Sequence, residues 1–122
     1  MSDRSEPRPT ITFGKFQNVD MRVAVVRSAP IASGTNAPSR LVSLDLGPLG
    51  RRQSVAQFAL VDEEELIDKF VVACINLAPR QIGEHLSEAL VLGVPHPDSP
   101  SDQAQAIPLS VSDLATPGDR VF

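Results

Sequence analysis

Apolar and polar residues alternate along much of this chain in short runs, a pattern typical of β-strands. The run VDMRVAVV at residues 19–26 places valine or methionine at every second position. Because successive side chains of a strand point to opposite faces, this run predicts a strand with one face on a core. Runs of the same kind predict three further strands, at residues 41–46, 51–58 and 87–94. The strand at residues 51–58 is unusually polar.

One segment is apolar without alternation, the run FVVACINL at residues 70–77. A short continuous apolar run predicts a strand that is buried on both faces. The acidic segment DEEELI at residues 62–67 precedes it and predicts a short helix. Asp62 is a suitable N-cap, Glu65 stands at the position of a capping box, and the acidic first turn suits the helix dipole.

Two segments rich in proline, glycine and serine predict long loops, at residues 27–40 and 95–105. The first contains residues 33–39, SGTNAPS, which carry no charge. After the second loop we expect a further short strand at residues 106–111 and a turn at residues 117–119.

The chain has five phenylalanines and neither tryptophan nor tyrosine. The spacing of Phe13 and Phe16 predicts a short helical turn, or one apolar cover over the end of a sheet. We expect Phe13, Phe16 and Phe58 to pack in the core. Single-stranded nucleic acids are usually held by aromatic stacking, so an RNA site here would depend on shape, arginine and polar contacts.

The order of the predicted elements is three strands, a short helix, two strands and a C-terminal extension. This is the order of a five-stranded OB-fold barrel, an all-β fold, and a small β-sandwich is the alternative. Residues 1–11 predict a disordered leader, because the segment is polar and contains two prolines between residues 2 and 9. Residues 12–122 then form one domain, since 122 residues are too few for two ordinary domains.

Composition narrows the class of protein. The net charge is −4, which argues against a general nucleic-acid binder, although a local basic patch remains compatible with it. The single cysteine, Cys74, has no partner for a disulfide, and its apolar neighbours predict a buried inert thiol in a reducing cytosol. The N-terminus lacks the apolar segment of a signal peptide, and no stretch is long enough to span a membrane.

The residue types that carry enzyme chemistry lack the required spacing. No glycine-rich phosphate loop is present, and Cys74 has no CxxC partner for zinc. His85 and His96 are separated by a predicted strand, and no serine has the context of a nucleophile elbow. We therefore expect a protein that is not an enzyme and that has no metal site and no cofactor.

Several motifs together resemble one family. They are Val19-Asp20-Met21-Arg22-Val23, RRQSVAQ at 51–57, Asn76-x-x-Pro79-Arg80-x-Ile82-Gly83, Ser87-Glu88-x-Leu90-x-Leu92-Gly93 and the terminal PGDRVF. The chain resembles the CsaA family over residues 12–122. That family is related to the tRNA-binding domain at the C-terminus of many bacterial methionyl-tRNA synthetases. The resemblance implies an OB fold, a homodimer, binding of tRNA, and a secretion-related chaperone activity toward unfolded or exported polypeptides. The cysteine usage adds the expectation that the protein is cytoplasmic.

The candidate ligand-binding residues combine these motifs with the polar strand at 51–58. Several of them have alternative roles. Asn76 is alternatively a turn-capping side chain, and the arginines at 40, 51 and 52 are alternatively ordinary surface residues. Glu88 either accepts a hydrogen bond from a base edge or orients Arg80. We expect Pro79 and Gly83 to be structural, with Gly83 free to take a positive φ. The predicted tRNA- or ligand-binding set is Arg40, Arg51, Arg52, Gln53, Ser54, Gln57, Asn76, Arg80, Ser87 and Glu88.

Overall fold

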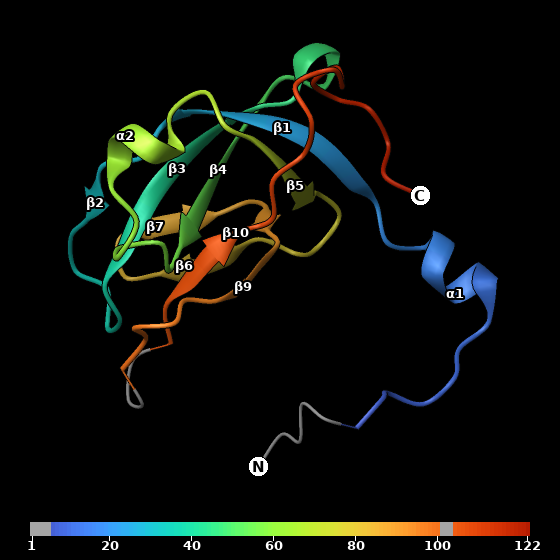
Figure 1. Cartoon of the computed structure of the whole chain (residues 1–122), viewed down its shortest axis with the longest axis horizontal. Coiled ribbons are helices and arrows are strands. Elements are labelled where there is room, and N and C mark those ends of the chain that lie inside the picture. The colour runs from blue at the N-terminus through green and yellow to red at the C-terminus, as the bar shows by residue number, and fades with distance from the viewer. Residues whose placement is uncertain (1–5, 101–103) are drawn as a thin grey trace.

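The computed structural model describes residues 6–100 and 104–122 and consists mostly of strands (Figure 1). The predicted leader lies partly outside this range, and residues 6–11 are exposed and belong to no helix or strand. The elements in chain order are α1 (Phe13–Gln17), β1 (Met21–Ser28), β2 (Ile31–Ala32), β3 (Ser39–Asp45), η1 (Gly47–Leu49), β4 (Arg51–Ala56), α2 (Glu63–Leu66), β5 (Phe70–Cys74), β6 (Arg80–Ile82), β7 (His85–Ser87), β8 (Leu90–Val91), β9 (Gly93–Pro95) and β10 (Ala106–Pro108).

The main sheet has the strand order β2-β3-β1-β5-β8, with β4 paired to β3. The long strand β1 lies at its centre and pairs antiparallel with both β3 and β5. A shift of register between Val26 and Ser28 marks where β1 bends. In β1, Val23 to Val26 are all buried, so both faces of this strand are covered, whereas the alternating pattern predicted one solvated face.

The sheet closes on itself between β4 and residues 87–88, mainly through side chains. The Glu88 amide donates to the Gln53 carbonyl (2.8 Å), and the Gln53 amide donates to the Glu88 carboxylate (3.0 Å). The Val55 amide donates to the Ser87 hydroxyl oxygen (3.0 Å). This closure, together with α2 between β4 and β5, gives the predicted OB-type barrel.

The core is aliphatic, with Leu44, Leu46, Leu66 and Val71 fully buried. Phe58 packs among them and is 3% exposed, as predicted. The prediction for the other two phenylalanines was wrong, because Phe13 and Phe16 are 70% and 37% exposed. They lie on α1, which stands to one side of the barrel, near the C-terminal end of the chain (Figure 1).

Three predictions of local structure need correction. The expected strand at 87–94 is divided among β7, β8 and β9, and β6 forms within the segment expected to be a turn. Gly93 begins β9, which pairs with β10 outside the main sheet, and an added Cβ there would lie 2.6 Å from the Ile107 carbonyl oxygen. Asp62 is the N-cap of α2, but its side chain makes no capping bond, so the predicted capping box is not formed.

Candidate nucleic-acid interface

A groove of about 750 Å³ crosses the barrel beside the closing seam. Its walls are the loop at residues 34–37 and β6, and its floor comes from the end of β4 and residues 90–93. The polar side chains that line it include Asn36, Gln57 and Arg80. The uncharged loop noted in the sequence therefore forms one wall of this groove.

The two walls meet at a pair of glycines. Gly34 and Gly83 both have positive φ values, 75° and 60°, and a Cβ added to Gly83 would overlap the Gly34 carbonyl oxygen. The His85 Nε2 atom lies 3.0 Å from the Ser33 carbonyl oxygen and adds a second contact. Glycine at 83 is thus required by the close approach of two backbones as well as by its φ angle.

Arg80 has the position expected of a ligand-binding cation. It is exposed, it lines the groove, and its guanidinium forms no ion pair or hydrogen bond with the described residues. The guanidinium can therefore accept an anionic group without losing an existing partner. Arg80 begins β6, which pairs antiparallel with β7 in a two-stranded sheet.

The other predicted arginines do not join Arg80 in a single patch. Arg40 is 8% exposed and donates to the carbonyl oxygens of Ala29 (2.8 Å), Val61 (3.1 Å) and Phe58 (3.2 Å). Arg52 donates to the Ile75 carbonyl oxygen (3.3 Å). Arg51 is exposed and lies 4.0 Å from Asp45. This placement gives Arg40 a structural position inside the barrel.

The predicted polar residues fall into two groups. Gln57 is exposed in the groove, and Ser54, although 1% exposed, also lines it. Gln53, Ser87 and Glu88 belong to the closing seam, where their backbone and side-chain groups bond one another. The structure thus brings Gln57 and Arg80 together at one groove and uses the seam residues to close the barrel.

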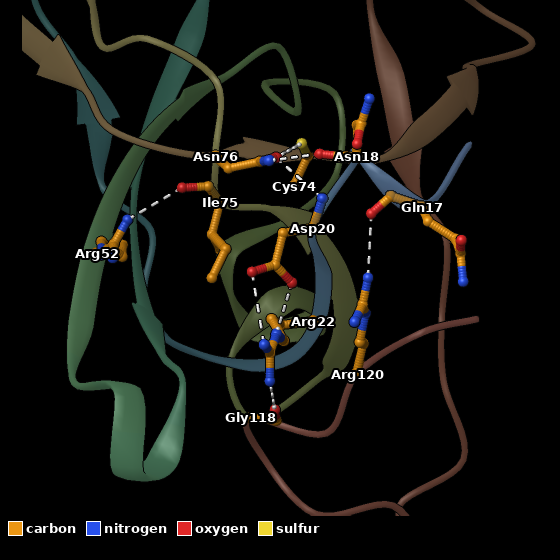
Figure 2. A network of polar contacts seen from close by, with 10 residues as sticks. All are labelled: Gln17, Asn18, Asp20, Arg22, Arg52, Cys74, Ile75, Asn76, Gly118 and Arg120. Carbon is orange, nitrogen blue, oxygen red and sulfur yellow. Dashed lines mark hydrogen bonds and ion pairs between the residues drawn. The ribbon is translucent and has the colours of Figure 1, made fainter. Parts of the chain in front are cut away.

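Asn76 lies outside the groove, at the junction of α1 and β1 (Figure 2). Its side chain accepts from the Asp20 amide (2.9 Å) and donates to the Asn18 carbonyl oxygen (2.7 Å). Both partners are more than fifty residues away in sequence. Asn76 therefore fixes the segment that carries α1, a role that the motif alone did not indicate.

A polar network extends from this junction to the C-terminal segment (Figure 2). Arg22 forms an ion pair with Asp20 (2.7 Å) and donates to the Gly118 carbonyl oxygen (3.1 Å). Arg120 donates to the Gln17 carbonyl oxygen at the end of α1 (3.1 Å). The network holds the N-terminal helix and the C-terminal segment side by side. No local pattern indicates the contacts of Arg22 with Gly118 and of Arg120 with Gln17, since these partners are distant along the chain.

An apolar hollow lies between these two segments, with a volume of about 270 Å³. Its apolar lining is Phe13, Phe16, Val19, Val121 and Phe122. Four of these side chains are large and exposed. We call this surface the terminal patch.

The pKa of Asp45, the last residue of β3, is shifted from its ordinary value. The Gly47 amide donates to Asp45 (2.9 Å), and this bond is the main cause that lowers the pKa of the Asp45 carboxyl below its ordinary value of 3.8. The nearby Arg27 guanidinium (3.2 Å) lowers the same pKa further. Asp45 therefore stabilises the turn at η1 in its ionised form.

The described residues hold no group of three or more His, Cys, Asp or Glu side chains that could bind a metal ion. Within the same residues, no helix is long and apolar enough to cross a membrane.

The fold and the groove define a class of protein: a small OB-type barrel with a groove between a loop and a β-hairpin. No family model matches the chain. In solved structures, it is similar to the CsaA chaperone protein of Picrophilus torridus (28% identity, TM-score 0.78) and to chaperone CsaA of Bacillus anthracis str. Ames (26%, 0.77). Each alignment covers 93% of this chain and all of the other. The MetRS related protein of Pyrococcus horikoshii shares the fold (21%, TM-score 0.78, covering 94% of this chain and all of the other).

Curated relatives extend this similarity to synthetases. The chain is 35% identical over 114 residues to a methionine–tRNA ligase of Thiobacillus denitrificans, and 36% identical over 115 residues to that of Methylibium petroleiphilum. These matches cover 92% and 93% of this chain but only 16% of each ligase. The resemblance predicted from the motifs, to CsaA and to a domain of methionyl-tRNA synthetases, is confirmed.

Proposed function

We propose that this domain is an RNA-binding module that holds tRNA at the groove between residues 34–37 and β6. The observation that carries the proposal is Arg80, an exposed cation without a partner among the described residues, beside the amides of Asn36 and Gln57. A guanidinium next to neutral hydrogen-bonding side chains suits a phosphate flanked by sugar and base edges. The similarity to a segment of methionine–tRNA ligases supports tRNA as the RNA.

The charge of the groove sets an expectation for affinity. Each phosphate that a protein neutralises adds about 0.7 to 0.9 to the salt slope of log K. With Arg80 as the free cation of the groove and Arg51 exposed elsewhere, we expect few phosphate contacts. Binding should therefore be weak and its salt slope shallow, in keeping with the net charge of −4.

The test is a titration with unlabelled protein and labelled tRNA at low and moderate salt. We expect Arg80→Gln to lower affinity about tenfold or more, as for loss of one charged hydrogen bond. Arg51→Gln is the matched control, because it removes the same charge from the surface outside the groove. Absence of binding at low salt, or equal affinity for the wild type and Arg80→Gln, would refute the proposal.

A second candidate function is binding of unfolded or exported polypeptides. It is favoured by three leucines near the groove, Leu77, Leu86 and Leu90, which are 52%, 44% and 49% exposed. The similarity to proteins described as CsaA chaperones agrees with it. Suppression of aggregation of an unfolded client should weaken on Leu77→Ser, and a wild-type protein without effect in that assay would count against this candidate.

We also propose that the protein is a homodimer that associates through the terminal patch. Phe13 and Phe122 are 70% and 100% exposed, and the polar network holds their segments together as one surface. Large exposed apolar patches mark interaction sites. Light scattering should give a dimer mass for the wild type and a monomer mass for Phe13→Ser; a wild-type monomer would refute this interface. The module is further proposed to act in the cytoplasm and without enzyme activity.

A further inference from the structure

A smaller hollow, which we call the slot, lies beside the groove under the β6–β7 hairpin and has a volume of about 160 Å³. Its apolar lining is Val55, Leu77, Ala78, Ile82, Ala89 and Leu90. Since a water molecule occupies about 30 Å³ of liquid, this slot has room for one large aliphatic side chain and not for a folded segment. No aromatic ring lines it, so it offers no stacking surface for a base.

Most polar groups of the slot are already bonded. The exceptions within the described residues are the Arg80 guanidinium and the second carboxylate oxygen of Glu88. The Ser87 hydroxyl accepts from the Val55 amide (3.0 Å) and donates to the Ala89 carbonyl oxygen (3.3 Å). One oxygen of Glu88 accepts from the Gln53 amide. Arg80 is the charged donor of the slot that has no partner in the described part of the chain. The slot thus joins an apolar pocket for one side chain to an unpaired cation, and the Glu88 carboxylate, bonded through one oxygen to the Gln53 amide, also lines it.

The neighbouring strand adds a third recognition element. β6 pairs antiparallel with β7, and across the described residues it has no strand on its other side. An exposed strand edge presents backbone donors and acceptors to an extended chain. RNA has no backbone that matches such an edge, whereas a polypeptide pairs with it directly.

We propose that the slot binds the carboxyl-terminal end of an extended polypeptide whose last residue is aliphatic. The terminal carboxylate bonds to Arg80, the last side chain fills the pocket between Leu77 and Leu90, and the preceding residues pair along the free edge of β6. This inference rests on the second candidate function and gives that function a defined ligand: a free aliphatic C-terminus.

The experiment is fluorescence anisotropy with a short labelled peptide, polar except for a C-terminal leucine. The same peptide is prepared with an amidated C-terminus and with serine in place of leucine. We expect the free-acid leucine peptide to bind about tenfold or more tightly than the amide, because a charged hydrogen bond is lost on amidation. The serine peptide should bind more weakly for lack of apolar burial.

Three variants assign the effect to the slot. Arg80→Gln should abolish the difference between acid and amide, and Ala78→Leu should fill the exposed side of the pocket and weaken the leucine peptide about tenfold. Arg51→Gln should behave as the wild type. Equal binding of acid and amide by the wild type, or an acid preference retained in Arg80→Gln, would overturn the proposal. So would free 4-methylpentanoate binding as tightly as the peptide, since the ligand would then be a small carboxylate.

A parallel tRNA titration separates this proposal from RNA binding. Ala78→Leu should bind tRNA as the wild type does, because the substitution adds an aliphatic group and removes no charge. If the wild type does not bind tRNA, the tRNA proposal fails, and the peptide titration still tests the slot independently. A wild type that binds tRNA but not the leucine peptide, with tRNA binding impaired in Ala78→Leu, would assign the slot to RNA and overturn the proposal.

Discussion

Replacing Arg40 with alanine should lower the free energy of unfolding of the protein, because Arg40 holds the barrel together and does not line the groove. The guanidinium is 8% exposed and bonds three carbonyl oxygens, those of Ala29, Phe58 and Val61. The substitution leaves these carbonyls without their donor, and each buried unsatisfied group costs about 1–3 kcal/mol. Some of them will gain water in the space that the side chain vacates. We therefore expect a loss of about 3–5 kcal/mol in the free energy of unfolding.

Urea unfolding followed by far-UV circular dichroism measures this loss, since the chain has neither tryptophan nor tyrosine to serve as a strong fluorescence probe. With a slope of about 1–3 kcal/mol per molar urea, the midpoint should fall by more than about 1 M. Arg51→Ala is the control: its side chain is 62% exposed, and we expect a change within about 0.5 kcal/mol. A variant Arg40→Ala with the wild-type midpoint would refute the structural role assigned to this arginine.

Three further predictions concern the loop contact, the junction at α1 and the response to acid. Gly83→Ala should destabilise the protein by about 1–3 kcal/mol, because the methyl group meets the Gly34 carbonyl in a backbone conformation with positive φ; an unchanged thermal midpoint would contradict the contact between the groove walls. Asn76→Ala should cost about 1–2 kcal/mol through two lost bonds, with faster amide exchange at Asp20 as its specific signature. Asp45 has a lowered pKa, so its stabilisation is present above about pH 4 and is lost as the pH falls through the folded-state pKa. Asp45→Asn should thus lower the urea midpoint at neutral pH, and the difference from the wild type should shrink in acid; a constant difference would exclude the ionised form as its cause.

The fold was predictable because its signals are local. Three local patterns each specify one element: the alternation in residues 19–26, the continuous apolar run at residues 70–77 and the acidic start of α2. The order of the elements then selects the OB barrel. The division of the last strands was not predictable in this way. β9 pairs with β10 outside the main sheet, and Gly93 lies so close to Ile107 that a Cβ would not fit there. The local pattern does not relate these two segments to each other.

The candidate site was predicted only in part, for a physical reason that the arginines illustrate. In the structure Arg80 and Arg40 both lie at the start of a strand, and no residue near either one in the sequence indicates which of them is free. One is free at the groove, and the other is buried because three carbonyls from distant segments surround it. Whether a charge is free to bind a ligand depends on such tertiary partners, which a local pattern cannot supply.

The way the barrel closes has a consequence for how the chain folds. Because the seam between β4 and residues 87–88 relies on the side chains of Ser87 and Glu88, it lacks the repeated backbone ladder that joins β3 to β4. The hairpin of β3 and β4 involves near neighbours in sequence, whereas the seam closes a loop of thirty-five residues between Gln53 and Glu88. The curved sheet should therefore assemble first and the seam last. Under native conditions, the Gln53 and Val55 amides should then exchange with solvent more readily than those of β1.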